Sequence, residues 1–441
     1  MRFFALLLLL ATGVSADPVE EVRQAEIAFA KAFADRDAAR FFSFVAGDAT
    51  FLSAGRTLYG REEVVKVWSG FFKDPVAPFS WGPERVVVSD DGTLGLSTGS
   101  IYDAQGLPAG SYISTWRRDA GGAWKVVFDG PGAPPPAVAE SAPNVEEGFI
   151  TTPDGARLHY RRIGRAPQTL IVPLGFILFD HVRQLSDVAT VITYDMRNRG
   201  RSSRVEATET LTIHQDIQDL ETVRRHFGID RFAAIGYSYL GAMVAMYAME
   251  HPQHVTRLVQ IGAVPPEYGK EYPEGLAEPQ QTMGLPDDLR KRYMEMREDA
   301  DRDPRVFCEL QAEVFSYLLV GNRENRGRVK SNCALENEWP ANFARHLESH
   351  WASVKKLQLT DQDMKKVTMP VLTIHGTRDR NAPYGAGREW ALRLPDARLV
   401  TVRGAAHSVH LEDPVTVWGA VRQFLRGEWP LGAEKVTSLV P

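Results

Sequence analysis

Three side chains that together can carry out acyl transfer occur in this chain, namely Ser238, Asp379 and His407. A serine hydroxyl attacks a carbonyl carbon only when a base takes its proton, and an acid must orient that base and balance its charge. In an open α/β sheet these groups follow one another in the order Ser, Asp or Glu, His. Each of the three comes just after a short apolar run that predicts a strand. We therefore expect one edge of a sheet to bring them together.

The sequence around Ser238 predicts a sharp turn from a strand into a helix. An apolar run at Phe232–Ile235 precedes the serine, and a helix of small residues follows it. Such a turn favours small residues two positions before and two positions after the serine. Gly236 fits this rule, whereas Leu240 occupies the second position and Gly241 follows it. The local motif is therefore weaker than the usual G-x-S-x-G, and the other two residues must support it.

The predicted acid and base lie in loops after two later strands. Asp379 follows a buried apolar strand, from whose end a carboxylate can reach inward. His407 follows the next predicted strand, in a loop that a glycine makes flexible. Two alternatives remain open at this point. His410 could replace His407 as the base, and Glu267, which follows another predicted strand, could replace Asp379 in a variant arrangement.

The segment from Glu146 to Gly427 resembles the α/β-hydrolase superfamily. Short apolar runs alternate with helical patterns, which predicts a doubly wound, mostly parallel sheet. The matching motifs are Tyr194–Ser202, similar to the D-x-R-x-x-G-x-S loop, and His375–Pro383, similar to H-G-x-x-D-x-x-x-P. The resemblance implies that Ser238 is the nucleophile, His407 the general base and then acid, and Asp379 the orienting carboxylate. It implies no cofactor.

The resemblance also implies an oxyanion hole made of two backbone N–H groups. We assign these to Tyr239 and to Phe176, because Phe176 lies in the loop after the predicted strand Thr169–Pro173. That loop usually reads His-Gly-x in the superfamily, and here the histidine is replaced by Leu174. In the 194–202 motif we expect Asp195 and Arg197 to pair and hold their loop. We expect His375 to pack against the acid loop.

About a hundred helix-rich residues, 264–366, interrupt the strand pattern and predict a cap over the active site. The cap faintly resembles that of proline iminopeptidases, which hold a substrate amine with glutamates, and Glu336 and Glu338 could do so here. The His-Gly-Gly-Pro-Gly loop of that family is missing. His346 and His350 share a helix face, but the H-E-x-x-H order of zinc sites is absent, so we predict no metal.

The first sixteen residues predict a cleaved secretory signal. Arg2 precedes a short apolar run, and the small residues Val14 and Ala16 have the spacing of a signal-peptidase site. The apolar run is far shorter than the ~20 residues that span a bilayer. We therefore expect an exported mature chain that begins near Asp17 and works in the periplasm or outside the cell, without a membrane anchor.

Residues 17–134 predict a small α+β domain. We expect an amphipathic helix at Val19–Phe42, a second helix at Arg61–Phe72 and then antiparallel strands. The strands are expected at Pro83–Ser89, Leu94–Tyr102, Gly110–Arg118 and Ala123–Asp129. This region resembles the cone-shaped nuclear transport factor 2-like superfamily and its SnoaL-type members. The resemblance is carried by the segments Val88–Gly95, Tyr112–Asp119 and Gly122–Asp129.

That superfamily includes isomerases, dehydratases and binding modules, so its fold alone implies no particular activity. We expect Trp81, Trp116 and Trp124 to pack in the core, and Asp129 to be a strand-end carboxylate instead of a pocket acid. The domain is expected to bind a ligand or to mediate a homodimer.

The remaining features set the boundaries. Residues 135–145 form a Pro- and Ala-rich linker, residues 146–430 the second domain, and residues 431–441 a loose tail. Cys308 and Cys333 are expected to form a disulfide, the alternative being two buried thiols. A net charge of −5 gives no electrostatic reason to expect nucleic acid as a partner.

These observations predict an exported serine hydrolase that cleaves an ester, or an amide, of a small to medium apolar molecule through an acyl-enzyme. A proline-iminopeptidase-like aminopeptidase is one alternative. A non-catalytic ligand-binding protein on a hydrolase fold is another, favoured by Leu240 in the turn and by the missing histidine of the oxyanion loop. Catalysis by the first domain, as an isomerase or dehydratase, lacks a clear acid–base pair.

Overall fold

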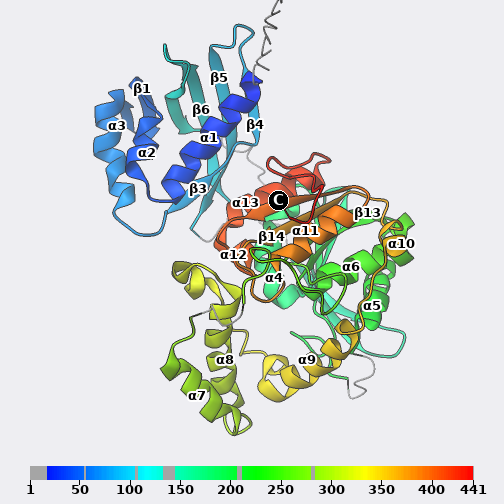
Figure 1. The fold of residues 1–441 in the computed structure, drawn as a ribbon. Helices are drawn as coiled ribbons and strands as arrows, with labels where there is room; N and C mark the ends of the chain where they lie inside the picture. The colour runs from blue at the N-terminus through cyan, green and yellow to red at the C-terminus, as the bar shows by residue number, and fades with distance from the viewer. Residues whose placement is uncertain are drawn as a thin grey trace, which may run out of the picture. The chain divides into compact units, whose positions relative to one another are not determined.

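A computed structural model of the protein describes residues 17–53, 56–104, 108–132, 145–205, 211–279 and 284–440 (Figure 1). The predicted signal segment and most of the predicted linker lie outside these ranges. The chain divides into two compact units between residues 138 and 139, and each unit is described by itself. Within the described ranges, the helices are too short or too polar to cross a membrane.

The helices of unit 1 differ from the prediction at one point. In place of a single helix at Val19–Phe42, α1 (Pro18–Ala34) and α2 (Ala38–Ser43) are separated by a short turn. Arg36 in that turn adopts a left-handed conformation with φ 63°, and Asp37 caps the second helix with its side chain. The predicted second helix is confirmed as α3 (Gly60–Trp68), which continues into η1 (Ser69–Phe72).

The sheet of unit 1 has seven strands, three more than the sequence predicted. Its strands are β1 (Val45–Ser53), β2 (Arg56–Tyr59), β3 (Phe79–Trp81), β4 (Arg85–Val88), β5 (Leu94–Asp103), β6 (Pro108–Arg118) and β7 (Trp124–Pro131). The order is β2-β1-β7-β6-β5-β3, with β4 also paired to β5. Of the missed strands, β1 pairs with the distant β7 and β3 with β5, so local alternation gives only a weak signal for these two, whereas β2 pairs with the neighbouring β1.

An aromatic core fills the space between the helices and the sheet of unit 1. Trp81, Trp116 and Trp124 are buried, as predicted. The ring of Phe29 packs on that of Phe41 with centroids 4.3 Å apart, and the ring of Phe33 packs on that of Phe79 at 4.8 Å. The helices and the sheet of unit 1 therefore enclose a continuous apolar interior, as expected for an α+β domain.

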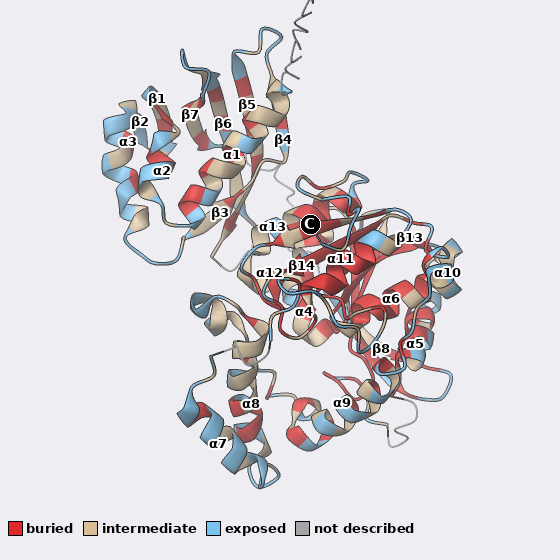
Figure 2. Ribbon diagram, in the orientation of Figure 1, coloured by how far each residue is buried: buried red, intermediate tan, exposed pale blue. Residues whose placement is uncertain are grey.

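Unit 2 is built on an eight-stranded sheet in the order β15-β14-β13-β12-β10-β11-β9-β8. The strands are β8 (Glu146–Thr151), β9 (Arg157–Ile163), β10 (Thr169–Pro173), β11 (Thr190–Tyr194), β12 (Phe232–Tyr237), β13 (Val255–Ile261), β14 (Val371–Gly376) and β15 (Ala397–Val402). The first two form the predicted hairpin, and β9 pairs antiparallel with β11, whereas β10 to β15 pair in parallel. The central strands are buried throughout, as expected for a sheet covered on both faces (Figure 2).

Helices cover this sheet in two groups. In one group, α4 contacts α13, because the ring of His181 stacks on that of Trp418. In the other group, α5 contacts α6 through the hydrogen bond that Tyr247 donates to Glu221. The helices are α4 (Gly175–Val182), η2 (Arg183–Asp187), α5 (Ile213–His226), α6 (Tyr239–Glu250), η4 (Pro252–His254), α11 (Tyr384–Arg393), α12 (Val409–Glu412) and α13 (Pro414–Leu425). Each parallel strand therefore ends beside the start of a helix or loop, where ligands bind in such sheets.

The predicted cap is helical, and the predicted disulfide between Cys308 and Cys333 is confirmed. It ties the longest cap helix to the loop after the 3-10 helix η6. The cap contains α7 (Asp287–Arg297), α8 (Pro304–Leu319), η6 (Arg323–Arg328), η7 (Glu336–Glu338), α9 (Pro340–Val354) and α10 (Asp361–Met364). Only one residue of α7 is buried, whereas α9 buries five (Figure 2).

The last residues are packed and do not form the loose tail that the sequence predicted. Glu434 forms an isolated β-bridge with Leu399, and the side chain of Val436 is buried. The buried guanidinium of Arg388 donates hydrogen bonds to the carbonyl oxygens of Ser438 and Leu439. These contacts satisfy a charged group that would otherwise be buried without a partner, which explains why this segment is ordered.

Candidate active site

Ser238 occupies the sharp turn between β12 and α6. Its backbone angles, φ 60° and ψ −129°, belong to a region that side chains rarely adopt. The Ser238 N–H donates to the Ile261 carbonyl of the neighbouring strand at 2.9 Å, which anchors the strained turn to the sheet. The side chain remains partly exposed, although β12 is buried along its whole length. This is the geometry of a nucleophile elbow.

The structure also explains why Leu240 is tolerated where a glycine is usual. A Cβ atom added to Gly236 would lie 2.2 Å from the Leu240 carbonyl oxygen, so the position two residues before the serine must be glycine. A Cβ atom on Gly241 would lie 2.7 Å from that of Ala263. The helix thus packs closely against the segment after β13 at Gly241, one residue later than in the usual motif. The side chain of Leu240 is fully buried.

Asp379 and His407 meet beyond the ends of β14 and β15. The His407 Nδ1 donates to Asp379 Oδ2 at 2.8 Å, and both side chains are almost completely buried. The other carboxylate oxygen of Asp379 accepts hydrogen bonds from the backbone N–H groups of Asn381 and Ala382, at 2.9 and 2.8 Å. Gly262 lies against the pair, since a Cβ atom there would be 3.1 Å from the His407 Nδ1.

The electrostatics of Asp379 favour its charged form. Burial by itself would raise the pKa of this carboxyl, but the charge of His407 and the hydrogen bonds from His375 and His407 outweigh burial and lower the pKa. An ionised Asp379 holds the proton of neutral His407 on Nδ1. The Nε2 lone pair then remains available to accept a proton.

That lone pair faces Asn381, which the sequence analysis did not single out. The Asn381 Nδ2 donates to the His407 Nε2 at 3.1 Å. Ser238 and His407 form no hydrogen bond with each other among the described residues. The only sequence signal for Asn381 is its place two residues after the predicted acid. The Asn381 amide, and not the serine hydroxyl, therefore forms the hydrogen bond to the His407 Nε2.

The alternative acid and base candidates lie elsewhere. His410 is buried, its Nδ1 has no partner among the described residues, and burial together with the charges of His181 and His407 lowers its pKa well below the ordinary value. Glu267 forms a β-bridge with Gln358 and is not bonded to His407 within the described ranges. His375 packs against the acid loop as expected, with its Nε2 2.9 Å from the Ala382 carbonyl oxygen.

The two residues assigned to the oxyanion hole lie at helix N-termini, and one of these helices, α6, begins directly after Ser238. Leu174 adopts a left-handed conformation with φ 69°, so that α4 begins immediately after β10. Neither Phe176 nor Tyr239 has a backbone N–H partner among the described residues, and each lies in the first turn of its helix. A Cβ atom on Gly200 would lie 2.9 Å from Cδ1 of Phe176, so the 195–202 loop fixes that ring.

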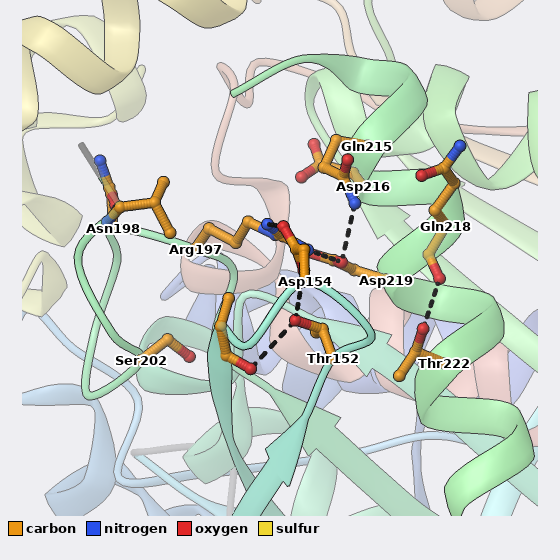
Figure 3. Close-up of polar contacts among 12 residues, drawn as sticks. Thr152, Asp154, Arg197, Asn198, Ser202, Gln215, Asp216, Gln218, Asp219 and Thr222 are labelled. Carbon is orange, nitrogen blue, oxygen red and sulfur yellow. Dashed lines mark hydrogen bonds and ion pairs between the residues drawn. The ribbon is translucent and has the colours of Figure 1, made fainter. Parts of the chain in front are cut away.

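The predicted pairing of Asp195 with Arg197 is wrong. Arg197 lies between Asp154 and Asp219, with its Nε 2.7 Å from Asp219 Oδ2 and its Nη2 2.9 Å from Asp154 Oδ1 (Figure 3). Asp195 instead contacts His159, with its Oδ2 3.2 Å from the His159 Nδ1. Two carboxylates from other elements compensate the buried guanidinium better than the neighbouring Asp195 could, and they tie the loop to β9 and α5.

The two cap glutamates take different positions. Glu338 is buried and accepts hydrogen bonds from the Arg199 Nη2 at 2.7 Å and from the Gly200 N–H at 2.8 Å. Glu336 is mostly exposed and lies 4.0 Å from a nitrogen of Arg204. The Glu338 carboxylate is therefore neutralised by Arg199, which leaves it poorly suited to hold a substrate amine.

Two cavities flank the candidate triad. A cavity of about 210 Å³ is lined by Tyr237, Phe176, Arg199 and Ser408, together with apolar cap residues and the disulfide. A second, more open cavity of about 690 Å³ is lined by Val264 and Asn381 and by residues of α9. Ser238 is a sequence neighbour of Tyr237, and its carbonyl oxygen accepts from the Val264 N–H at 3.4 Å. The two linings thus include a residue next to Ser238 and a residue two positions after Asp379.

Unit 1 contains a separate buried carboxylate cluster. Glu26 is fully buried, and its two oxygens accept hydrogen bonds from the indole nitrogens of Trp81 and Trp116 at 2.8 and 2.7 Å. Asp129 accepts from the Ser114 hydroxyl at 2.7 Å, and it lies inside β7, which continues two residues beyond the predicted end. Burial and the charge of Glu26 raise the pKa of Asp129 to about 8.

The described residues contain no group of three or more His, Cys, Asp or Glu side chains placed to hold a metal ion.

Comparison with known families agrees with this architecture. The sequence pattern of the alpha/beta hydrolase fold family matches residues 178–414, and that of the SnoaL-like domain matches residues 27–127. The chain therefore belongs to the alpha/beta hydrolase fold family and carries an N-terminal SnoaL-like domain, as the two resemblances predicted.

Individual relatives share the hydrolase unit at low identity. The bifunctional esterase/perhydrolase DCH of Acinetobacter calcoaceticus is 25% identical over 301 residues, which is 63% of this chain and 99% of the relative. The proline iminopeptidase PfmaB of Pestalotiopsis fici is 25% identical over 62% of this chain and 97% of its own length. A non-heme haloperoxidase of Rhodococcus erythropolis is 26% identical over 63% of this chain and 98% of its own length.

Solved structures show the same fold. The esterase EaEST from Exiguobacterium antarcticum superposes with a TM-score of 0.50 at 16% identity, covering 64% of this chain and all of the other. At that identity the likeness establishes the fold of unit 2 and leaves the substrate open.

Proposed function

We propose that this protein is a serine hydrolase that cleaves an ester bond through an acyl-enzyme. The observation that carries the proposal is the buried hydrogen bond from His407 Nδ1 to Asp379 Oδ2, at the sheet edge where Ser238 sits in a strained turn. The esterase among the relatives supports the same class of substrate. The apolar lining of the cavity of about 210 Å³ suits a small to medium apolar substituent.

The proposed reaction proceeds in two steps. The His407 Nε2 takes the proton of the Ser238 hydroxyl while Oγ attacks the substrate carbonyl carbon, and the N–H groups of Phe176 and Tyr239 stabilise the oxyanion. The C–O bond to the alcohol then breaks, and the imidazolium returns its proton to the leaving oxygen. Water, activated by the same Nε2, attacks the acyl-enzyme and releases the carboxylic acid and free Ser238.

Two other functions have some support. An aminopeptidase of the iminopeptidase type is favoured by the relative PfmaB, and the ion pair between Glu338 and Arg199 weighs against it. A non-catalytic ligand-binding protein is favoured by the hydrogen bond from Asn381 to His407, which occupies the position where a serine hydroxyl would bind.

Export to the periplasm or outside the cell is also part of the proposal. It is supported by the apolar run and the small residues before Asp17. Homodimerisation through unit 1 is supported by exposed apolar side chains on three of its strands, among them Leu52, Ile113 and Phe128.

Labelling with a fluorophosphonate probe tests the proposed function. The wild-type protein should be labelled, and Ser238→Ala should lose labelling and lose about 10⁴-fold or more of its ester hydrolysis. Ser438→Ala, the same change at an exposed serine, is the matched control and should behave as the wild type does. Absence of labelling in a folded wild-type protein would contradict the triad. Hydrolysis of aminoacyl amides but not of esters would favour the aminopeptidase.

A further inference from the structure

The inward face of the cap helix α9 is polar, although it is buried. Asn342, His346 and His350 recur every four residues and therefore lie on one side of the helix. Their side chains are only 8%, 2% and 3% exposed. A buried helix face is usually apolar, because each buried polar atom must find a hydrogen-bond partner. We call these three residues the α9 strip.

Each member of the strip has an unused hydrogen-bonding atom. The Asn342 Nδ2 donates to the carbonyl oxygens of Asn198 and Asn337, both at 2.7 Å, which identifies Oδ1 as the remaining acceptor. That Oδ1 has no partner among the described residues, and neither do the two ring nitrogens of His346. Unpaired buried polar atoms are rare in native proteins and call for an explanation.

His350 adds a further acceptor. Its Nε2 lies 2.7 Å from Asp216 Oδ2, so the proton of the neutral ring is held on Nε2 by the carboxylate. The opposite nitrogen, Nδ1, is then an acceptor, and it has no partner among the described residues. The rings of His346 and His350 are 4.5 Å apart. The strip thus offers three acceptors and one N–H donor in a row.

The strip lies beside the candidate nucleophile. The ring of Tyr239, the residue that follows Ser238, is 4.6 Å from the ring of His350. At the other end, the Arg199 guanidinium packs over the rings of Phe343 and Phe176, at 5.0 and 5.1 Å. Tyr239 therefore contacts the His350 end of the strip, and Arg199 links Phe176 to Phe343, which follows Asn342 in the sequence.

The same helix also borders both cavities. Phe343 lines the cavity of about 210 Å³, and Leu347 and Trp351 line the cavity of about 690 Å³. Each of these three residues directly follows a member of the strip in the sequence, so the strip runs along α9 next to the stripe that lines the two cavities.

We propose that the α9 strip, with His346 at its centre, is a subsite that binds a neutral hydroxyl group of the substrate. The inference rests on the proposed ester hydrolysis and specifies its substrate as an ester with a hydroxyl on its acyl or its alcohol part. The hydroxyl proton is donated to one of the acceptors of the strip, and the hydroxyl oxygen accepts from the N–H of His346.

The chemistry of the strip selects a hydroxyl over charged groups. Three of its four unused positions are acceptors, which repel a carboxylate. Burial, together with the charge of Arg199, holds the pKa of His346 well below its ordinary value, so this site disfavours positive charge and therefore an ammonium group. A hydroxyl both donates and accepts, as does the neutral imidazole of His346.

Matched pairs of esters test the inference on the full-length protein. The first pair is methyl 3-hydroxybutyrate and methyl butyrate, and the second is 2-hydroxyethyl butyrate and propyl butyrate. The measured quantity is the ratio of kcat/KM for the hydroxylated ester to that for its partner. We expect the wild-type ratio to exceed one for at least one pair. We expect His346→Leu to lower that ratio by about tenfold, the effect of leaving a buried hydroxyl unpaired.

His214→Leu is the matched control, because it makes the same change at a histidine whose side chain is 64% exposed, and its ratio should equal that of the wild type. His346→Gln retains a donor and an acceptor and should keep part of the ratio. A wild-type ratio at or below one in both pairs overturns the inference without any variant, as does an unchanged ratio in folded His346→Leu. Fluorophosphonate labelling of Ser238 separates this failure from failure of the proposed hydrolysis, because labelling does not depend on a substrate hydroxyl.

Discussion

Each unit holds an aspartate that is shielded from water, fully in the case of Asp379 and partly in the case of Asp129, and the pKa values of the two carboxyl groups move in opposite directions. In unit 2, Asp379 faces His407 and two backbone N–H groups, and its pKa is lowered although it is fully buried. In unit 1, Asp129 faces the hydroxyl of Ser114 and the carboxylate of Glu26, and its pKa is raised to about 8.

The comparison shows that burial does not set the charge of a carboxyl group by itself. Desolvation raises the pKa in both cases, and the outcome depends on whether the neighbours donate hydrogen bonds and carry positive charge. Asp379 has such neighbours and is suited to hold a histidine that becomes charged during a reaction. Asp129 accepts a hydrogen bond from the Ser114 hydroxyl but lies near the negative charge of Glu26, and it is suited to keep its proton near neutral pH.

The largest expected effect comes from neutralising Asp379. Asp379→Asn should lower kcat for ester hydrolysis by about 10³- to 10⁴-fold, because the amide no longer holds the His407 proton on Nδ1 or stabilises the imidazolium. Asp129→Asn, the same change at the aspartate of unit 1, should leave ester hydrolysis unchanged. Initial rates with a 4-nitrophenyl ester measure both variants. Similar rates for the wild type and Asp379→Asn would contradict the assigned acid.

A smaller effect is expected when a second carboxylate faces the base. Asn381→Asp places a negative charge beside the His407 Nε2, which favours the imidazolium and raises the pKa of the base. We expect the acid limb of the pH profile of kcat/KM to move upward by about one pH unit. At pH values below that limb, kcat/KM should therefore fall about tenfold.

Asn381→Ala removes the amide without adding charge, and it should shift the limb much less than Asn381→Asp does. An acid limb that stays in place in Asn381→Asp would show that Asn381 does not contact the base in solution.

The smallest effect concerns the stability of unit 1. The folded pKa of Asp129, about 8, lies above its ordinary value of 3.8, so the folded state binds the proton more tightly than the unfolded chain does. The resulting stabilisation is fully present below pH 3.8 and is lost as the pH rises to about 8. Because the side chain is partly exposed, we expect this loss to be roughly 1 to 3 kcal/mol.

Hydrogen exchange of peptides from residues 108–132, measured at pH 5 and pH 8 and corrected for intrinsic rates, tests this expectation in the full chain. Asp129→Asn should flatten the pH dependence, with a residual slope of the same sign from Glu26, whose pKa burial also raises. Equal protection at the two pH values in the wild type would contradict the raised pKa of Asp129.

Local patterns were sufficient for much of the fold. The run of small residues after Ser238, the turn at Pro153–Gly155 and the alternating strands and helices of unit 2 correspond to the elements observed. Strand β1 of unit 1 and the packed end of the chain were missed. Both are held by distant partners, namely β7 and Leu399, and pairing over such separations leaves no periodic signal in the sequence.

The sequence by itself determined which residues are available for chemistry and in what order, because a serine hydrolase on an open sheet requires a fixed succession of strand ends. It also indicated the two domains, and it left open whether Cys308 and Cys333 form a disulfide or remain two buried thiols. Only the tertiary structure decided that Asn381 contacts the base, that Arg199 neutralises Glu338 and that the buried histidines of α9 keep nitrogens without partners among the described residues. These relations depend on contacts within a few ångströms between segments up to about 140 residues apart, and such distances are set by packing.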